Sequence, residues 1–246
     1  MSLLRCFQVF DQLCRSGHVL SFCENGGIRL ISRAIAAYRG GATSLRHHAL
    51  SCAAASAAHR QIVKSNWPNS DITALLIELS MSAHPSPIWC SKRRRPPHAS
   101  SRHDQAWPVS HCEEASAALF AATETDSCIV DSVVDKNLCA SLVSTAAAMS
   151  EHSCGVAVAL LRVCCKCVQL LSVQTAQQLQ DSKTVQRLTI VLKSSTIQRG
   201  PQHVDTAAVE SLRMYSSMLL VALASELGES VLQVTLPVSH NLYWPC

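Results

Sequence analysis

The stretch Glu24-Asn25-Gly26-Gly27-Ile28-Arg29-Leu30-Ile31 ends one apolar helical pattern and begins another. Before it, apolar residues recur at three- and four-residue steps, which is the signature of one buried helix face: Leu4, Phe7, Phe10, Leu13 and Cys14. After it, a second stripe follows at Ile28, Ile31, Ala34, Ile35 and Tyr38. Glycine suits the left-handed conformation that often ends a helix. We therefore expect two helices that are separated by a turn at the glycine pair.

The same plan recurs along the chain. Later breaks in the apolar pattern lie at 64–71, 135–137 and near Asp181-Ser182, and the last long stripe ends at Gly228. The first apolar residues after the breaks are Ile28, Ile72, Leu138, Val185 and Val231, which lie 44, 66, 47 and 46 residues apart. Three of these four intervals fall at or close to the period of roughly 40–47 residues that is typical of helical-repeat proteins.

Two segments resemble the armadillo repeat. The run 25–31 resembles the glycine-glycine-isoleucine junction that opens the third helix of that repeat, and 59–66 resembles the helix end before the junction. The glycine pair is kept in the first unit alone, and Ser70-Asp71, Lys136-Asn137 and Lys183-Thr184 replace it later. The likeness covers the chain loosely. It implies three-helix units stacked into a right-handed superhelix, with the third helices lining a concave groove for extended peptides or partner helices.

The composition is compatible with this architecture. The chain has 246 residues, of which 48% are hydrophobic but only 4% aromatic, so aliphatic residues, alanine and cysteine must fill its core. We predict an all-α fold, a right-handed superhelix of armadillo-like repeats. Repeats 1 and 2 occupy 1–83, an irregular insertion or linker 84–113, repeats 3 to 5 114–232, and an irregular tail 233–246. The first unit begins without a polar capping helix, so we expect either a longer array or an exposed apolar end.

The segment 84–113 differs in composition from the rest. It holds five of the nine prolines and the basic run Lys92-Arg93-Arg94-Arg95. Proline removes a backbone donor and disfavours helix at the preceding residue, so a long loop is expected. Three interpretations stay open: a solvated disordered loop, a basic patch for nuclear localisation or an acidic partner, and a gene-model error such as a translated intron.

The sequence offers no catalytic or metal centre that we can defend, and it predicts no cofactor. The cysteine group at 164–167 has no second pair at zinc spacing, so core packing is favoured. Adjacent His47 and His48 point about 100° apart on a helix, which favours a surface pair. The possible ligands His98, His103, His111, Cys90 and Cys112 fit no zinc pattern. The common hydrolase, metalloprotease, nucleotide-binding and dinucleotide-binding motifs are absent, and we predict that the protein is not an enzyme.

Thirteen cysteines raise the question of the compartment. Arg5 interrupts the first apolar stretch, so no secretory signal is predicted, and a reducing cytoplasmic or nuclear setting is favoured. No membrane span is predicted, because the apolar stretches 156–171 and 214–227 are interrupted by Arg162, Lys166 and Glu226. The formal net charge of +4 lies largely in the run 92–95, which argues against a nucleic-acid-coating surface.

These patterns favour a non-enzymatic scaffold that binds a protein partner rather than a small-molecule substrate. The predicted groove contacts are polar residues on the third helices: Arg33, Glu78, Ser144 and Arg187. Importin-like armadillo proteins carry a repeated Trp with Asn four residues on, whereas Trp67 is followed at that offset by Asp71, so that mode of peptide binding is disfavoured. The alternatives are a nucleic-acid- or ribosome-associated protein that uses 92–95, and a regulatory subunit whose active residues lie in another chain.

Overall fold

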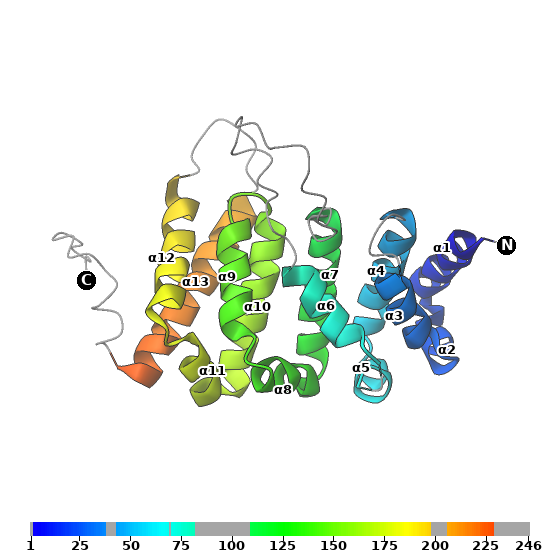
Figure 1. The fold of residues 1–246 in the computed structure, drawn as a ribbon, viewed down its shortest axis with the longest axis horizontal. Coiled ribbons are helices and arrows are strands. Elements are labelled where there is room, and N and C mark those ends of the chain that lie inside the picture. The colour runs from blue at the N-terminus through cyan, green and yellow to red at the C-terminus, as the bar shows by residue number, and fades with distance from the viewer. Residues whose placement is uncertain (1, 38–42, 69, 82–108, 198–205, 229–246) are drawn as a thin grey trace, which may run out of the picture.

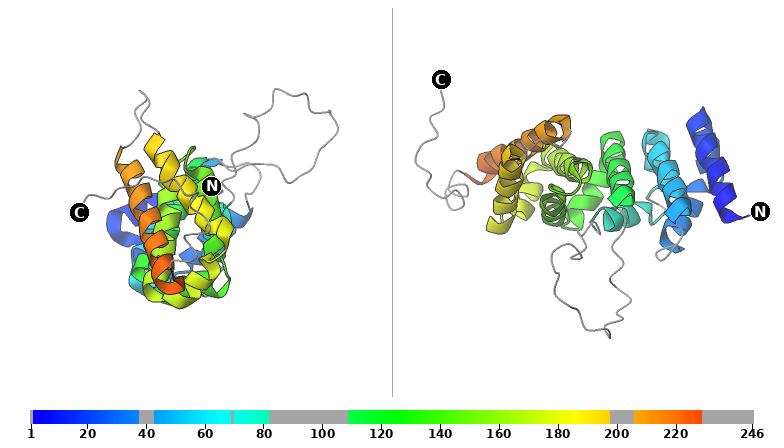
Figure 2. Two further views of the ribbon diagram at one scale, coloured as in Figure 1. Left: turned by 90° about the vertical axis from the view of Figure 1, so that its left-hand side faces the viewer. Right: turned by 90° about the horizontal axis from the view of Figure 1, so that it is seen from above.

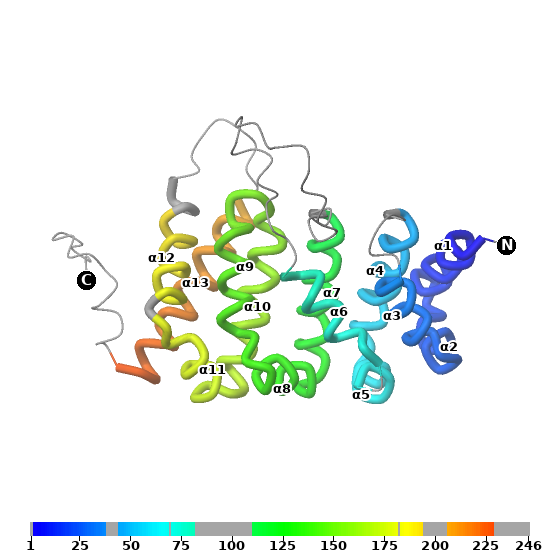
Figure 3. Tube along the Cα trace, in the orientation of Figure 1, coloured from blue at the N-terminus to red at the C-terminus, as the bar shows by residue number. Residues whose placement is uncertain are grey.

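The computed structural model describes residues 2–37, 43–68, 70–81, 109–197 and 206–228. All the regular secondary structure in these ranges is helical, which confirms the predicted all-α class. Apart from a short π-helical segment at Cys14–His18 that joins α1 to α2, the elements are α-helices. They follow one another along an elongated molecule from the N-terminal end to the C-terminal end (Figures 1 and 3).

The helices fall into three rows. The first row consists of α1 (Leu3–Leu13), α4 (Thr43–Ala57), α7 (Val109–Thr125), α10 (Cys154–Leu170) and α13 (Thr206–Leu227). The second row consists of the short helices α2 (Val19–Glu24), α5 (Arg60–Asn66), α8 (Ser127–Asp135) and α11 (Ser172–Leu179). The third row consists of α3 (Gly27–Ala37), α6 (Ile72–Met81), α9 (Cys139–Met149) and α12 (Ser182–Ile197). In the first and third rows each helix packs against the next one, and Figure 2 shows the resulting array from its end and from above.

The starts of the third-row helices agree with the apolar pattern. They lie within three residues of Ile28, Ile72, Leu138 and Val185, so the predicted breaks are confirmed at these four places. The fifth position, Val231, lies outside the described residues. The last long helix ends as predicted, because Gly228 follows it with a φ of 81°.

The turn before α3 depends on its two glycines. Gly26 has a φ of 86°, which side chains rarely adopt. Gly27 is buried, and a Cβ atom built on it would lie 2.6 Å from the ring and the carbonyl oxygen of Phe22. At the turn before α9, Asn137 takes the left-handed conformation instead, with a φ of 54°. Asparagine tolerates this region better than most residues, which explains how that turn forms without a glycine pair.

Small and aliphatic side chains build one continuous core between the rows. Alanine and cysteine occupy many fully buried positions on first-row helices, among them Ala49, Cys52 and Ala53 on α4 and Ala115, Ala118 and Ala122 on α7. Such short side chains let neighbouring helix axes approach closely. On α10, Cys164 and Cys167 are also fully buried, in agreement with the packing role predicted for this group.

Two local expectations need correction, and the structure adds two features that the sequence analysis did not predict. Gly17, with a φ of 89°, separates α1 from α2 at a kink that the apolar pattern does not reveal. The predicted apolar stripe from Val156 to Leu171 agrees with α10, but the short helix α11 that follows it was not predicted. Helix α7 starts at Val109, earlier than residue 113, so His111 and Cys112 are buried helical residues rather than loop residues. Trp67 lies at a break, but its side chain is fully buried in the core.

Helix α13 is the one described helix that is long and apolar enough to cross a membrane by length and composition. It also packs against α10, α11 and α12 through a face that contains Leu212, Leu219 and Leu223. A core helix passes the same length and composition test, so this finding is weak evidence for a span.

Candidate partner-binding site

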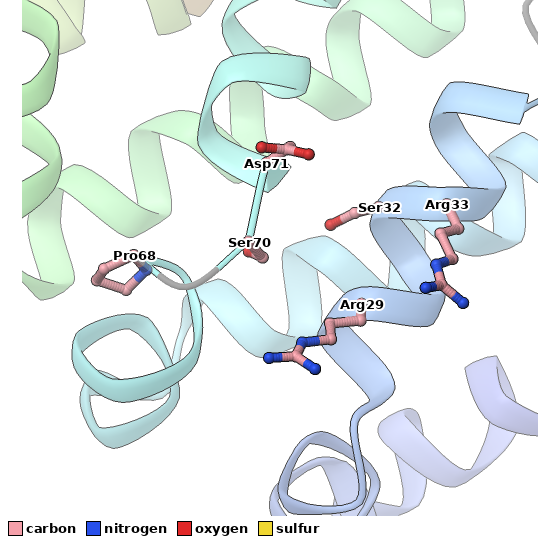
Figure 4. Close-up of a pocket in the computed structure, with 6 residues that line it drawn as sticks. All are labelled: Arg29, Ser32, Arg33, Pro68, Ser70 and Asp71. Atoms are coloured by element: carbon pink, nitrogen blue, oxygen red, sulfur yellow. The ribbon is translucent and has the colours of Figure 1, made fainter.

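A surface pocket of about 540 Å³ lies between α3 and the turn that leads into α6. Its walls are Arg29, Ser32 and Arg33 on one side and Pro68, Ser70 and Asp71 on the other (Figure 4). The two sides come from consecutive helices of the third row. The pocket is therefore a junction between two neighbouring helix groups.

The packing of α3 explains why its arginines face the pocket. Ile28, Ile31 and Ile35 are buried on one face, which leaves Arg29 and Arg33 exposed one turn apart on another. Between these faces, Ser32 donates a hydrogen bond to the carbonyl of Ile28 at 2.9 Å.

The opposite wall is held by the core. Trp67 is fully buried, and its carbonyl accepts hydrogen bonds from the hydroxyl of Ser70 at 2.9 Å and from the backbone N–H of Ser70 at 3.0 Å. The carbonyl of Asp71 in turn accepts from the N–H of Leu75 in the first turn of α6. The buried tryptophan thus fixes the turn that carries Ser70 and Asp71.

The pocket favours an anionic ligand group. The guanidinium groups of Arg29 and Arg33 have no hydrogen-bond or ion-pair partner in the described parts of the chain, and Figure 4 shows Arg29 extending toward the opposite wall. Asp71 is the one carboxylate in the lining, and it stands at the start of α6, where the helix dipole is positive. Guanidinium groups bind carboxylates and phosphates through paired hydrogen bonds. Both serine hydroxyls of the lining donate hydrogen bonds to backbone carbonyls, Ser32 to Ile28 and Ser70 to Trp67.

All four predicted contact residues lie on the third row. Arg33 lines the pocket, Glu78 is exposed on α6, Ser144 is half-buried on α9, and Arg187 is half-buried on α12. They lie on α3, α6, α9 and α12, which are the four helices of the third row, and they do not line one common cavity. Their role in binding stays a prediction. The basic run Lys92 to Arg95 lies outside the described residues.

Sequence reasoning missed five of the six pocket residues: Arg29, Ser32, Pro68, Ser70 and Asp71. The i,i+4 spacing of Arg29 and Arg33 is the signal that could have found the first of them. Nothing in the sequence indicates that Ser70 and Asp71 lie opposite these arginines, because that depends on how α3 packs against α6.

A second polar cluster ties α1 to α4. The buried carboxylate of Asp11 accepts hydrogen bonds from Arg15 Nε at 2.9 Å and from Ser51 Oγ at 2.6 Å, and His48 Nδ1 lies 2.9 Å from it. Burial alone raises the pKa of Asp11, but the hydrogen bonds from Arg15, Ser51 and His48 outweigh it and hold the pKa below its usual value.

We predicted that His47 and His48 form a surface pair, but each of them contacts a carboxylate on a different neighbouring helix. His48 contacts Asp11, whereas the exposed His47 contacts Glu114 on α7. Burial raises the pKa of Glu114, and the contact with His47 only partly opposes this shift. Each histidine therefore joins α4 to a different neighbour in the first row.

We expect Asp11→Asn to lower the free energy of unfolding by about 1–3 kcal/mol near pH 6, because hydrogen bonds to a buried charge are lost. The folded-state pKa of Asp11 lies below the unfolded value of 3.8, so the ionised carboxylate stabilises the fold above that pH. This contribution is lost as the pH falls through the folded-state pKa. Urea unfolding between pH 6 and pH 2.5 should therefore show the difference between wild type and variant shrinking in acid.

Glu114→Gln is the matched control, because the shift at Glu114 has the opposite sign. A raised folded-state pKa means that ionisation of Glu114 costs stability as the pH rises above 4.5. The wild type should accordingly lose stability relative to Glu114→Gln over that rise. A pH-independent gap for Asp11→Asn would contradict the assigned ionisation.

Eight of the described cysteines are buried. All eleven cysteines in the described residues are free thiols. Burial raises the pKa of Cys23 and of Cys165 to about 12 and that of Cys112 to about 11, so these thiols are protonated and weakly nucleophilic at neutral pH. Within the described ranges, no three His, Cys, Asp or Glu side chains are arranged to hold a metal ion.

Comparison with known proteins adds no relative. No protein family, no curated protein and no solved structure matches this chain.

Proposed function

We propose that this chain is a non-enzymatic scaffold, a superhelix of armadillo-like units that binds a protein partner along its third row of helices. The observation that carries the proposal is the pocket between α3 and α6, where two exposed arginines without ion-pair partners face a turn held by Trp67. The three-row packing supports the repeat interpretation, because first-row and third-row helices each pack against the next helix in their row.

The partner would cross several third-row helices. Residues Arg33, Glu78, Ser144 and Arg187 occupy similar places, because each lies five or six residues after the first residue of its helix. A partner segment laid across these positions would contact the pocket between α3 and α6 first and the polar side chains of α9 and α12 afterwards. We place the protein in the cytoplasm, with the nucleus as the alternative, since its core thiols suit a reducing compartment.

The test is a double charge reversal, Arg29→Glu with Arg33→Glu, in the tagged full-length chain. Both side chains are exposed, so the fold should be retained, which circular dichroism would check. We expect quantitative mass spectrometry of co-purified proteins to show at least a tenfold loss of the main partner. The introduced glutamates would repel the anionic group of the partner that the two arginines attract.

The matched control is Arg5→Glu, which reverses an exposed charge on α1, away from the third row. It should leave the partner signal unchanged. Equal losses in both variants, or no loss in either, would contradict the proposal. A partner signal that disappears on treatment with nuclease, or falls steeply with salt in every variant, would favour nucleic-acid association through the basic run instead.

A further inference from the structure

The two ends of the helix array both carry apolar surface. At the N-terminal end, a hollow of about 430 Å³ lies between α1, α2 and α3, with Phe10, Leu13, Phe22 and Leu30 among its walls. Phe10 and Phe22 pack ring to ring there, with centroids 4.7 Å apart. Leu13 and Leu30 remain 40% and 42% exposed, so the hollow is apolar and open to solvent.

The C-terminal end presents a ridge instead. Met214, Met218 and Val221 lie at i, i+4 and i+7 on α13, and they form what we call the outer stripe of that helix. They are 49%, 42% and 68% exposed. The opposite face of α13 holds Leu212, Leu219 and Leu223, which are buried against its neighbours.

The comparison with α10 shows that the outer stripe is unusual. Helix α10 packs between α7 and α13 and buries residues on more than one side, including Val156, Leu161 and Cys165. Helix α13 has a similarly apolar composition, but in the described structure it has a first-row neighbour on one side only. Helix α13 therefore has the composition of an internal helix, although it is the last described helix of the first row.

We propose that a second copy of this chain covers the outer stripe, by placing the hollow of its own N-terminal end over it. In this contact, α1 of the second copy would pack against α13 in the way that α13 packs against α10. The first row of helices would therefore continue from one copy into the next. A convex stripe and a concave hollow of the same apolar character are complementary, whereas two stripes or two hollows are less so. This inference is independent of the proposed function.

A head-to-tail contact has a consequence for assembly. Each added copy leaves one hollow and one stripe free, so the association does not stop at a dimer. Sedimentation velocity of the full-length chain at rising concentration should show a mass that grows past twice the monomer mass of 26.6 kDa.

Two variants separate the two surfaces. Leu13→Glu places a carboxylate in the hollow, and Val221→Glu places one on the outer stripe, and both positions are exposed enough to leave the fold intact. Each variant alone should sediment as a monomer, because an unpaired charge opposes apolar contact. An equimolar mixture should form a dimer and nothing larger, since one intact stripe then meets one intact hollow.

Gln8→Glu is the control, because it adds the same charge to an exposed position of α1 outside the hollow, and it should associate like the wild type. The proposal is overturned if the wild type stays monomeric at all concentrations or if the mixture stays monomeric. It is also overturned if Leu13→Glu alone still associates, which would indicate stripe-to-stripe pairing. Association only after deletion of 229–246 would overturn it too, in favour of a stripe covered by that segment.

Discussion

Trp67→Ala is expected to lower the free energy of unfolding by about 3–5 kcal/mol, the usual cost of removing a large aromatic side chain from a core. Trp67 is fully buried and is among the largest side chains in the described core. Its loss would leave a cavity where α5 ends, next to the turn that carries Ser70 and Asp71. Urea unfolding followed by circular dichroism would measure the change.

The matched variant is Trp67→Phe, which keeps most of the apolar volume. The indole N–H of Trp67 has no hydrogen-bond partner among the described residues, so phenylalanine leaves no partner group unpaired. We expect Trp67→Phe to lower the free energy of unfolding by less than half as much as Trp67→Ala does. If Trp67→Ala cost less than about 1 kcal/mol, the buried position of this side chain would be refuted.

Gly27→Ala should have the second-largest effect, a loss of about 1–3 kcal/mol from overpacking. The added Cβ would meet both the ring of Phe22 and its backbone carbonyl at 2.6 Å. The ring can rotate away, but the carbonyl belongs to α2 and cannot move without shifting that helix. Thermal unfolding should show a clearly lower midpoint for this variant.

Gly155→Ala provides the comparison, because it makes the same chemical change near the start of α10. Its Cβ would meet no atom closer than 3.7 Å, an ordinary contact. Alanine also has the higher helix propensity, so we expect no loss and a gain of up to about 0.5 kcal/mol. Equal effects of the two substitutions would contradict the tight packing assigned to Gly27.

Much of the helical order could be predicted from the sequence, because apolar periodicity records which helix face is buried. The starts of α3, α6, α9 and α12 follow directly from that pattern. The kink at Gly17 could not be predicted this way. Cys14 before it and Val19 after it are both buried, so the apolar pattern continues across the kink. The burial of Trp67 was not predicted, because Pro68 after it indicates a break, and a break does not exclude burial of the residue before it.

The candidate site was predictable only in part. Arg33 was found because a polar residue on the exposed face of a third helix is a natural contact residue. Its partners across the pocket depend on the packing of α3 against α6, and that packing is set by contacts between side chains distant in sequence. The cluster around Asp11 was missed for the same reason, because Asp11 and Ser51 are 40 residues apart.

Site-specific photocrosslinking in cells tests the central claim most directly. A photoreactive amino acid would replace Arg33, Glu78, Ser144 or Arg187 on the third row, and Asp131 or Gln177 as exposed controls on the second row. The account predicts that the same partner protein is captured from several third-row positions and from neither control position. Capture from the second-row positions, with none from the third row, would contradict it.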